Sequence, residues 1–287
     1  MADSFENAAP APGDPQLHPG LAVLRMAGLL ADAEARPEAE GLDELAREVA
    51  AGALRVAAPP DIWRELQAGL MRRRPSQTIE ILRRCGALAE ILPEVAALFG
   101  VPQLSDGAAE IDIGDHLLRA LDEAAACAAP LPVRFALLVE NVGKADSPRE
   151  HLPAHYRHME RGAPRIEAIC TRFDVSRDCR DLAMAANAEC ERVHRVSRMR
   201  AGPIAAMLAR LGAFRAQEHF ALLMTLCACD WRGHPGRAGR AYPKAALLEI
   251  AFAACAGIVD SDDDATMAAR AEAIALALRS MRWDVQE

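Results

Sequence analysis

Clustered arginines are the first residues of this sequence that could do chemistry. Arg72, Arg73 and Arg74 are consecutive, and Arg83 and Arg84 follow shortly after them. Guanidinium groups at such spacing suit contacts with the phosphates of a nucleic acid, which hold it without reading its base sequence. The same residues also suit a solvated helix end. The sequence leaves both interpretations open.

Two further clusters of arginine lie in the C-terminal half of the chain. The first comprises Arg192, Arg195, Arg198 and Arg200, and the second comprises Arg232, Arg237 and Arg240 near Trp231. An arginine-rich segment beside an indole could bind a nucleic acid by charge and by stacking. An indole is more often packed in a protein core, and this is the role we expect for Trp231.

Cysteine is the second residue type that could do chemistry, and the chain has eight of them. They form no CxxC pair, and Cys227 and Cys229 would point apart on a helix, so we expect no metal site made of cysteines. Cys190 lies one helical turn before His194. Nothing nearby indicates an oxyanion hole or an orienting third group, which argues against nucleophilic catalysis. We expect reduced thiols that fill the core of a cytoplasmic protein.

The composition predicts that helices position these residues. Hydrophobic residues make up 52% of the chain but aromatic residues only 4%, so Ala and Leu, which favour helices, dominate. The net charge of −8 argues against a protein that coats nucleic acid broadly, although a local basic face is compatible with it. No apolar run approaches the roughly 20 residues of a membrane span, and no secretory signal opens the sequence. We therefore expect a cytoplasmic protein without a membrane partner.

The pattern of apolar residues divides the chain into three parts. Residues 1–18 are rich in Pro and Ala and are predicted to be a disordered tail. Residues 19–105 and 106–287 each carry apolar residues at helical spacing. This spacing predicts two helical regions that together form an irregular, all-α bundle of many short helices.

Breaks in the apolar pattern predict where individual helices begin and end. After Pro59-Pro60, Asp61 is expected to cap a helix, and Ser76 is expected to cap the next one. The segment 100–107 is predicted to be a loop. In the second region the expected helices span about 114–128 and 131–143, and others begin near residues 160, 176, 201, 216, 242 and 262.

Four segments of the sequence resemble a known family. They are Trp63–Gln103, Arg134–Ala145, His151–Gly162 and Cys229–Gly236, and they occur in the family's order. Together they resemble the neck, body and C-terminal HD domain of class II bacterial tRNA nucleotidyltransferases, the CCA-adding enzymes. The resemblance implies an all-α fold with the neck and body in residues 19–105 and a degenerate HD-like domain in residues 106–287.

The resemblance also implies a reaction that this chain alone does not perform. The family's catalytic head carries a Gly-Gly-x-x-R segment and a D-x-D pair that binds two metal ions for nucleotidyl transfer. Neither precedes the neck-like segment here, and Leu17–Arg25 lacks the acidic residues with which the family's neck opens. We therefore expect that the chain by itself does not add CCA.

The family's HD domain implies a metal site and its ligands. In the family a first His, an HD pair and later His residues bind divalent ions that activate water for hydrolysis of phosphate esters. His116 matches the first His, Glu140 and Asn141 stand at the HD pair, and His155 and His158 match later histidines. Asn141 is a neutral ligand and much weaker than the Asp that it replaces.

Two states of this altered site are compatible with the sequence. His116, Glu140, His155 and His158 could bind one divalent ion (Mn, Zn or Mg), because imidazole and carboxylate groups are ligands for such metals. Alternatively, the site is vestigial and held by hydrogen bonds, in which case no cofactor is expected. Lys144, at the family's Gly-Lys position, is either a surface or structural residue or a phosphate contact.

Two further positions match the family. Cys190 stands where the family has another His, with His194 nearby, and Asp230 matches a family Asp. We expect a structural role for Asp230, either as a helix cap or as the partner of Arg232.

These observations predict a relative of the tRNA nucleotidyltransferases that lacks catalysis and binds tRNA, another structured RNA or a protein partner. Three alternatives stay open. The chain could be a metal-dependent HD-type phosphohydrolase with an altered site, the tail half of a split tRNA nucleotidyltransferase, or a scaffold for protein interactions. Any remaining catalysis would be phosphohydrolase or phosphodiesterase activity and not nucleotidyl transfer.

Overall fold

The computed structural model describes residues 18–33, 39–105, 109–261 and 263–279. The predicted disordered tail lies outside these ranges except for His18, whose side chain caps the first helix by accepting a hydrogen bond from the Gly20 N–H at 3.2 Å. The predicted domain boundary at residue 106 also lies outside them.

The described residues form helices and one short hairpin. The elements are α1 (Pro19–Asp32), α2 (Ala39–Ala50), η1 (Ala53–Val56), α3 (Pro59–Leu70), α4 (Pro75–Arg84), α5 (Ala87–Ile91), α6 (Pro93–Ala96), β1 (Pro102–Ser105), β2 (Ala109–Asp112), α7 (Ile113–Ala126), α8 (Leu131–Val139), η3 (Val142–Lys144), η4 (Arg149–His151), α9 (His158–Phe173), α10 (Arg177–His194), η5 (Val196–Arg198), α11 (Ala201–Arg210), α12 (Gln217–Arg232), α13 (Pro243–Ala254) and α14 (Asp264–Leu278). The predicted all-α bundle is confirmed.

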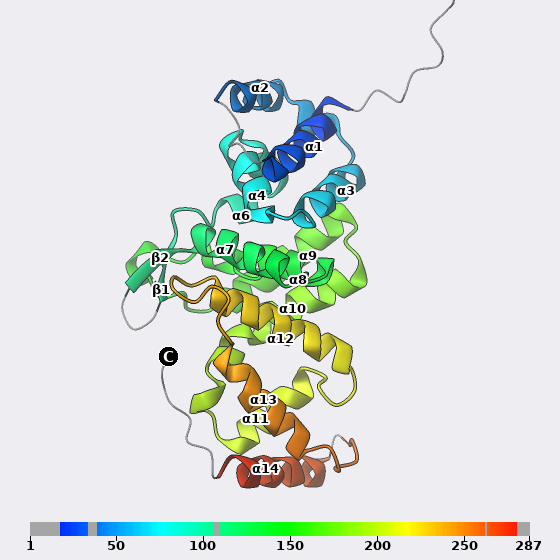
Figure 1. Ribbon diagram of the computed structural model, residues 1–287, viewed down its shortest axis with the longest axis vertical. Helices are drawn as coiled ribbons and strands as arrows, with labels where there is room; N and C mark the ends of the chain where they lie inside the picture. Colours follow the sequence, from blue (N-terminus) through cyan, green and yellow to red (C-terminus); the bar gives the residue numbers. More distant parts are fainter. Residues whose placement is uncertain (1–17, 34–38, 106–108, 262, 280–287) are drawn as a thin grey trace, which may run out of the picture.

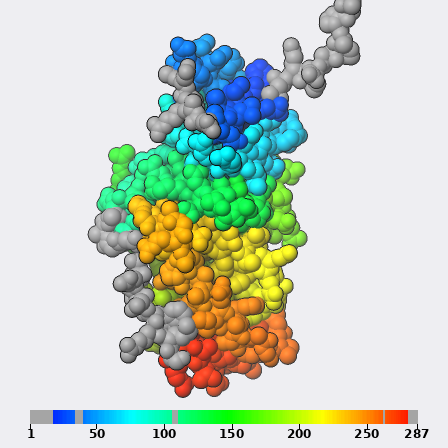
Figure 2. Space-filling model, viewed as in Figure 1, coloured from blue at the N-terminus to red at the C-terminus, as the bar shows by residue number. Residues whose placement is uncertain are grey.

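The helices stack along one long axis, with α1 and α2 at one end and α14 at the other (Figure 1). In the space-filling view the colours run from blue to red along this axis, so distance along the sequence broadly follows distance along the molecule (Figure 2). Among the described helices, none is long and apolar enough to cross a membrane.

Two helix starts differ from the sequence expectation. α3 begins at Pro59, and Asp61 therefore lies inside the helix and is not its cap. Proline is tolerated in the first turn of a helix because the N–H groups there have no partner within the helix. α4 begins at Pro75, and Ser76 is likewise inside it. The Ser76 hydroxyl instead donates to Asp122 of α7 at 2.7 Å, and so ties α4 to the second helical region.

Arg134 joins the two helical regions at a buried contact. It lies in α8 with 5% of its surface exposed. Its guanidinium donates to the carbonyl oxygens of Leu70 at 2.8 Å and Arg72 at 3.0 Å, and to that of Ala129 at 2.9 Å. The first two carbonyls lie at the C-terminal end of α3, where helix carbonyls lack helical partners. The guanidinium therefore caps α3 from α8.

The predicted loop at 100–107 contains a strand. β1 pairs antiparallel with β2, with Pro102 opposite Asp112 and Ser105 opposite Ala109. The two strands come from opposite sides of the predicted boundary, so the hairpin connects the two regions. The predicted helices of the second region are confirmed, although α8 ends at Val139 and leaves Glu140 and Asn141 at its C-terminus.

The eight cysteines are all free, and seven of them are buried while Cys127 is exposed. This agrees with the expected role of most cysteines as small core residues. α10 packs against α8 and α12, and α12 packs against α7. These four helices hold the side chains described next.

Candidate active-site pocket between α7, α10 and α12

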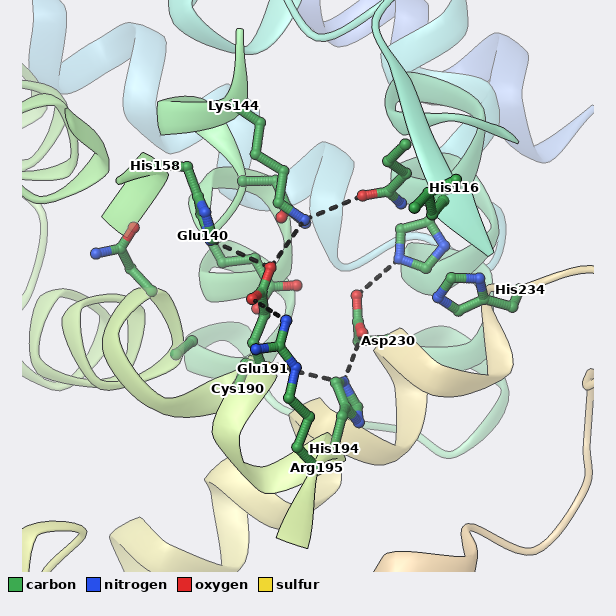
Figure 3. Close-up of a pocket in the computed structure, with 15 residues that line it drawn as sticks. His116, Glu140, Lys144, His158, Cys190, Glu191, His194, Arg195, Asp230 and His234 are labelled. Carbon is green, nitrogen blue, oxygen red and sulfur yellow. Dashed lines mark hydrogen bonds and ion pairs between the residues drawn. The ribbon is translucent and has the colours of Figure 1, made fainter. Parts of the chain in front are cut away.

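A polar pocket with a volume of about 210 Å³ opens where α7, α10 and α12 meet (Figure 3). His116 comes from α7, and Cys190, Glu191 and His194 come from α10. Asp230 comes from α12. The end of α8, η3, the start of α9 and β1 supply further lining residues. Segments more than a hundred residues apart in the sequence therefore share this pocket.

Asp230 lies at the centre of one hydrogen-bond network. Its Oδ1 accepts a hydrogen bond from His116 Nε2 at 2.7 Å, and its Oδ2 accepts one from His194 Nε2 at 2.8 Å. On its other side, the His194 ring contacts the Tyr242 hydroxyl through Nδ1 at 2.7 Å. The Asp230 side chain is buried, and a buried charge needs such partners.

The charges in this network stabilise one another. Burial alone would raise the pKa of Asp230, but His116 and His194 hold it well below its usual value. Burial alone would lower the pKa of His194, but contacts with Cys190 and with Asp230 raise it to about 10. The contact with Cys227, together with burial, raises the pKa of the Cys190 thiol well above its usual value, so the charged partner of His194 near pH 7 is Asp230.

A second network lies on the opposite wall of the pocket. The Lys144 ammonium donates to Gln103 Oε1 at 3.0 Å and lies 3.7 Å from Glu191 Oε1. His158 Nε2 lies 3.3 Å from the same Glu191 oxygen, and Arg195 pairs with the other at 3.1 Å. Burial opposes the ionisation of Glu191, but Lys144 and His158 lower its pKa below the usual value. Glu191 is therefore an anion that three basic side chains contact.

Glu140 and Asn141, at the position of the HD pair, both line the pocket. Glu140 is 5% exposed, and its Oε2 has no hydrogen-bond partner. Burial, followed by the nearby Asp230 carboxylate, raises the pKa of Glu140 well above its usual value. Burial and Asp230 thus disfavour the charged form of Glu140, and Asn141 beside it is an uncharged amide.

The four residues proposed as metal ligands have different surroundings. His116, Glu140 and His158 line the pocket, whereas His155 does not. His155 Nε2 donates to the Pro102 carbonyl at 2.9 Å, and its Nδ1 contacts the Ser147 hydroxyl at 2.8 Å. Both ring nitrogens of His155 are thus engaged away from the pocket, and the four-residue metal set stays a prediction.

Asp230 does not have the partner that the sequence suggested. Arg232 donates to the carbonyl of Arg240 at 2.7 Å, and Asp230 points in the other direction, to His116 and His194. The prediction of an Asp230–Arg232 pair was wrong, because the partners of Asp230 come from α7 and α10. Trp231 is half-buried and packs against the core, as expected, and Arg237 lies over its ring.

His234 is the pocket residue that the sequence analysis missed. It follows α12, and its ring centre lies 4.5 Å from that of His116. Its Nδ1 contacts the Ser105 hydroxyl of β1 at 2.8 Å. Burial and the neighbouring His116 lower the pKa of His234 to about 4, so the ring is neutral near pH 7. Its place within the segment Cys229–Gly236 was the available signal.

The predicted phosphate-binding residues fall into two groups, those exposed to solvent and those that already pair with another group of the protein. Arg73 and Arg84 are exposed. Arg72 pairs with Asp32 at 3.0 Å, Arg74 donates to the Ala33 carbonyl at 2.9 Å, and Arg83 pairs with Glu80 at 2.7 Å. Lys144 is buried in the pocket and is not a surface residue.

Comparison with known proteins gives one consistent result. The chain is 42% identical over 220 residues to the Multifunctional CCA protein of Cupriavidus necator, a match that covers 77% of this chain and 54% of that protein. The Multifunctional CCA protein of Burkholderia lata is 37% identical over 270 residues, which cover 90% and 65% of the two chains. The chain is homologous to the multifunctional CCA proteins. A search of protein-family models finds no match.

The homology covers the helices that build the pocket. The Multifunctional CCA protein of Cupriavidus taiwanensis is 40% identical over 249 residues, with 83% of this chain covered. The chain spans between 54% and 65% of the length of these three CCA proteins. The resemblance inferred from the sequence motifs is thereby confirmed.

Proposed function

We propose that this protein holds structured RNA, with tRNA as the first candidate, and that it does not hydrolyse phosphate esters through the HD position. Its homology to the multifunctional CCA proteins supports an RNA partner. The exposed Arg73 and Arg84 are cations suited to backbone phosphates, because such contacts need charge at the surface and no particular base.

The observation that carries the second half of the proposal is the environment of Glu140. A divalent ion at the HD position requires an imidazole and a charged carboxylate side by side. Here neither residue at that position is an imidazole: Glu140 is buried beside the Asp230 carboxylate, which raises its pKa, and its neighbour Asn141 is an uncharged amide. These two residues do not fit a divalent ion at that position.

The test measures, in the same sample, whether the protein binds tRNA and whether the tRNA stays uncleaved. Deacylated tRNA with a fluorescent label is titrated with the purified full chain in Mn²⁺-containing buffer, and anisotropy is read at low salt. We expect a dissociation constant on the order of micromolar, the non-specific range for phosphate contacts. A denaturing gel of the same samples should show intact tRNA. Absence of binding at low salt, or cleavage of the bound tRNA, contradicts the proposal.

A second candidate function has one specific observation in its favour. Ligand atoms of His116, Asp230 and His234 all lie within 4.8 Å of one another, so the pocket has a possible metal-binding group that does not use the HD position. A metal-dependent phosphohydrolase is the activity that this group would suit. Metal-dependent hydrolysis of bis(p-nitrophenyl) phosphate that is lost in Asp230→Asn would favour this candidate over the first.

A further inference from the structure

We propose that Cys127 and Cys229 are a site of reversible oxidation, at which peroxide converts the two thiols into a disulfide between α7 and α12. This inference goes beyond RNA holding and depends neither on it nor on a metal ion. The two sulfur atoms lie 3.7 Å apart, although the residues are 102 positions apart in the sequence. Cys127 directly follows α7, and Cys229 lies in the last turn of α12.

The two cysteines of α12 each meet a thiol from a different neighbouring helix. Cys227 and Cys229 are two residues apart, so their side chains leave the helix in different directions. Cys229 contacts Cys127 at the end of α7, whereas the Cys227 sulfur lies 3.6 Å from that of Cys190 on α10. α12 therefore carries two close pairs of thiols.

The two pairs differ in their access to solvent. Cys127 is exposed, whereas Cys229 is 0% exposed. In the other pair, Cys190 is only 7% exposed and Cys227 is 0% exposed. Oxidation of cysteine depends on exposure, so a dissolved oxidant should react first at Cys127. Cys229 is then the thiol that completes the disulfide.

The two sulfur atoms need only a short movement to bond. A disulfide bond is about 2.05 Å long, so the sulfurs must approach by about 1.7 Å. Cys127 lies at the C-terminal cap of α7, and Ala128 after it leaves the helix with a φ of 53°. Helix ends fray more readily than helix interiors, so Cys127 is the partner that can move.

Oxidation by peroxide takes two steps. Peroxide transfers one oxygen atom to the Cys127 sulfur, which gives a sulfenic acid and one water. The Cys229 sulfur then attacks the Cys127 sulfur and forms the S–S bond, and the displaced hydroxyl group leaves with the Cys229 proton as a second water. The two thiols are thereby oxidised and the peroxide is reduced. A thiol reductant reverses the reaction by exchange.

The experiment treats the reduced full chain, freed of reductant, with hydrogen peroxide. The remaining thiols are alkylated in denaturant, and the peptides are mapped by mass spectrometry without reduction. We expect the Cys127 and Cys229 peptides to be joined, with a loss of two hydrogen atoms, and those of Cys190 and Cys227 to be alkylated. Because the disulfide closes a loop of about a hundred residues, the urea midpoint should rise by about 1 M and return after reduction with dithiothreitol.

Single variants separate the roles of the two cysteines, with the fold of each checked by circular dichroism. In Cys229→Ala, dimedone should label the sulfenic acid of Cys127, because no second thiol removes it. In Cys127→Ala, the buried Cys229 should stay reduced, and peroxide should no longer shift the urea midpoint. Cys85→Ala removes a buried cysteine outside both pairs and should form the disulfide as the wild type does.

Three results would overturn the inference. The first is that Cys127 and Cys229 stay reduced in the folded chain, whether or not another cysteine reacts. The second is that Cys190 and Cys227 are joined before them. The third is that the Cys127–Cys229 disulfide forms only when urea has unfolded the chain.

Discussion

At the scale of the residue, two buried charges, Asp230 and Arg270, are each stabilised by more than one contact. Asp230 receives hydrogen bonds from His116 and His194. Arg270 of α14 is 1% exposed, donates to Asp260 Oδ1 at 2.5 Å and lies 3.9 Å above the ring of Phe214. Such partners offset the cost of removing a charge from water. The buried charges therefore have specific, testable effects on stability.

Arg270→Met tests the pair at the C-terminal end of the molecule. The variant keeps much of the apolar volume but loses the hydrogen bond to Asp260 and the contact with the ring, so the free energy of unfolding should fall by about 1–3 kcal/mol. Urea denaturation at pH 7 measures this. Arg177→Met, an exposed arginine with only an i,i+4 partner, should change the value by less than about 0.5 kcal/mol.

The same variant makes a prediction about pH. Hydrogen bonds from Arg270 and from Arg215 lower the pKa of Asp260 below its usual 3.8. A lowered carboxyl pKa stabilises the fold above the unfolded-state pKa, and this stabilisation is lost as pH falls through the folded-state pKa. The stability difference between wild type and Arg270→Met should therefore shrink as pH falls below about 4. A difference that stays constant from pH 7 to pH 2.5 would contradict this assignment.

At the scale of the element, close approach of the backbone fixes η3 against α9. A Cβ placed on Gly143 would collide with the carbonyl oxygen of His158 and with the N–H of Gly162. Backbone atoms cannot rotate away, so Gly143→Ala should lower the free energy of unfolding by about 3 kcal/mol or more. Gly202→Ala in α11 is the matched control, because its Cβ would meet nothing within 4 Å. Equal stability of the two variants in urea would show that η3 does not pack as described.

Arg134→Met tests the contact between α8 and α3. The substitution leaves the carbonyls of Leu70, Arg72 and Ala129 without the guanidinium that they now share. Each unpaired buried polar group costs about 1–3 kcal/mol, and partial hydration reduces the sum, so we expect a loss of about 2–4 kcal/mol. Urea denaturation followed by circular dichroism gives the value. A stability equal to that of the wild type would mean that this contact does not join the two regions.

Most of the helices could be predicted from the sequence, but the partners of the site residues could not. The Ala- and Leu-rich periodicity and the Gly and Pro breaks are local signals, and they located α7, α9, α10 and α12 to within a few residues. The hairpin was missed because strands of four residues are too short to show a clear alternation. For Asp230 the sequence suggested only its neighbour Arg232 as a partner. Its partners in the structure, His116 and His194, are brought to it by tertiary packing.

His234 shows the same limit at the pocket. Apart from its place in the family-like segment Cys229–Gly236, its local sequence is that of a histidine in a surface turn. Its neighbours are His116 on α7 and Ser105 on β1, which lie 118 and 129 residues away in the sequence. Only the packing of α12 on α7, together with the hairpin, brings the three together. Groups of side chains that come together across such distances are visible in the structure and not in the sequence.

At the scale of the whole molecule, the homology favours an RNA partner whereas the net charge opposes one. The chain is homologous to multifunctional CCA proteins, yet it carries a net charge of −8. The RNA binding that we propose should therefore depend on a local group of cations and weaken steeply with salt. Three of the five predicted arginines already have partners, which leaves the exposed Arg73 and Arg84 as the first positions to test.

The most direct measurement is the salt dependence of tRNA binding for the wild type, the double variant Arg73→Ala/Arg84→Ala and the control Arg177→Ala. We expect the double variant to bind more weakly and its slope of log K against log salt to be smaller by about 2, close to 1 for each lost phosphate contact. The control should reproduce the wild-type line. Three coincident lines would contradict an RNA-holding surface at these arginines, and no binding of the wild type at low salt would contradict the central claim itself.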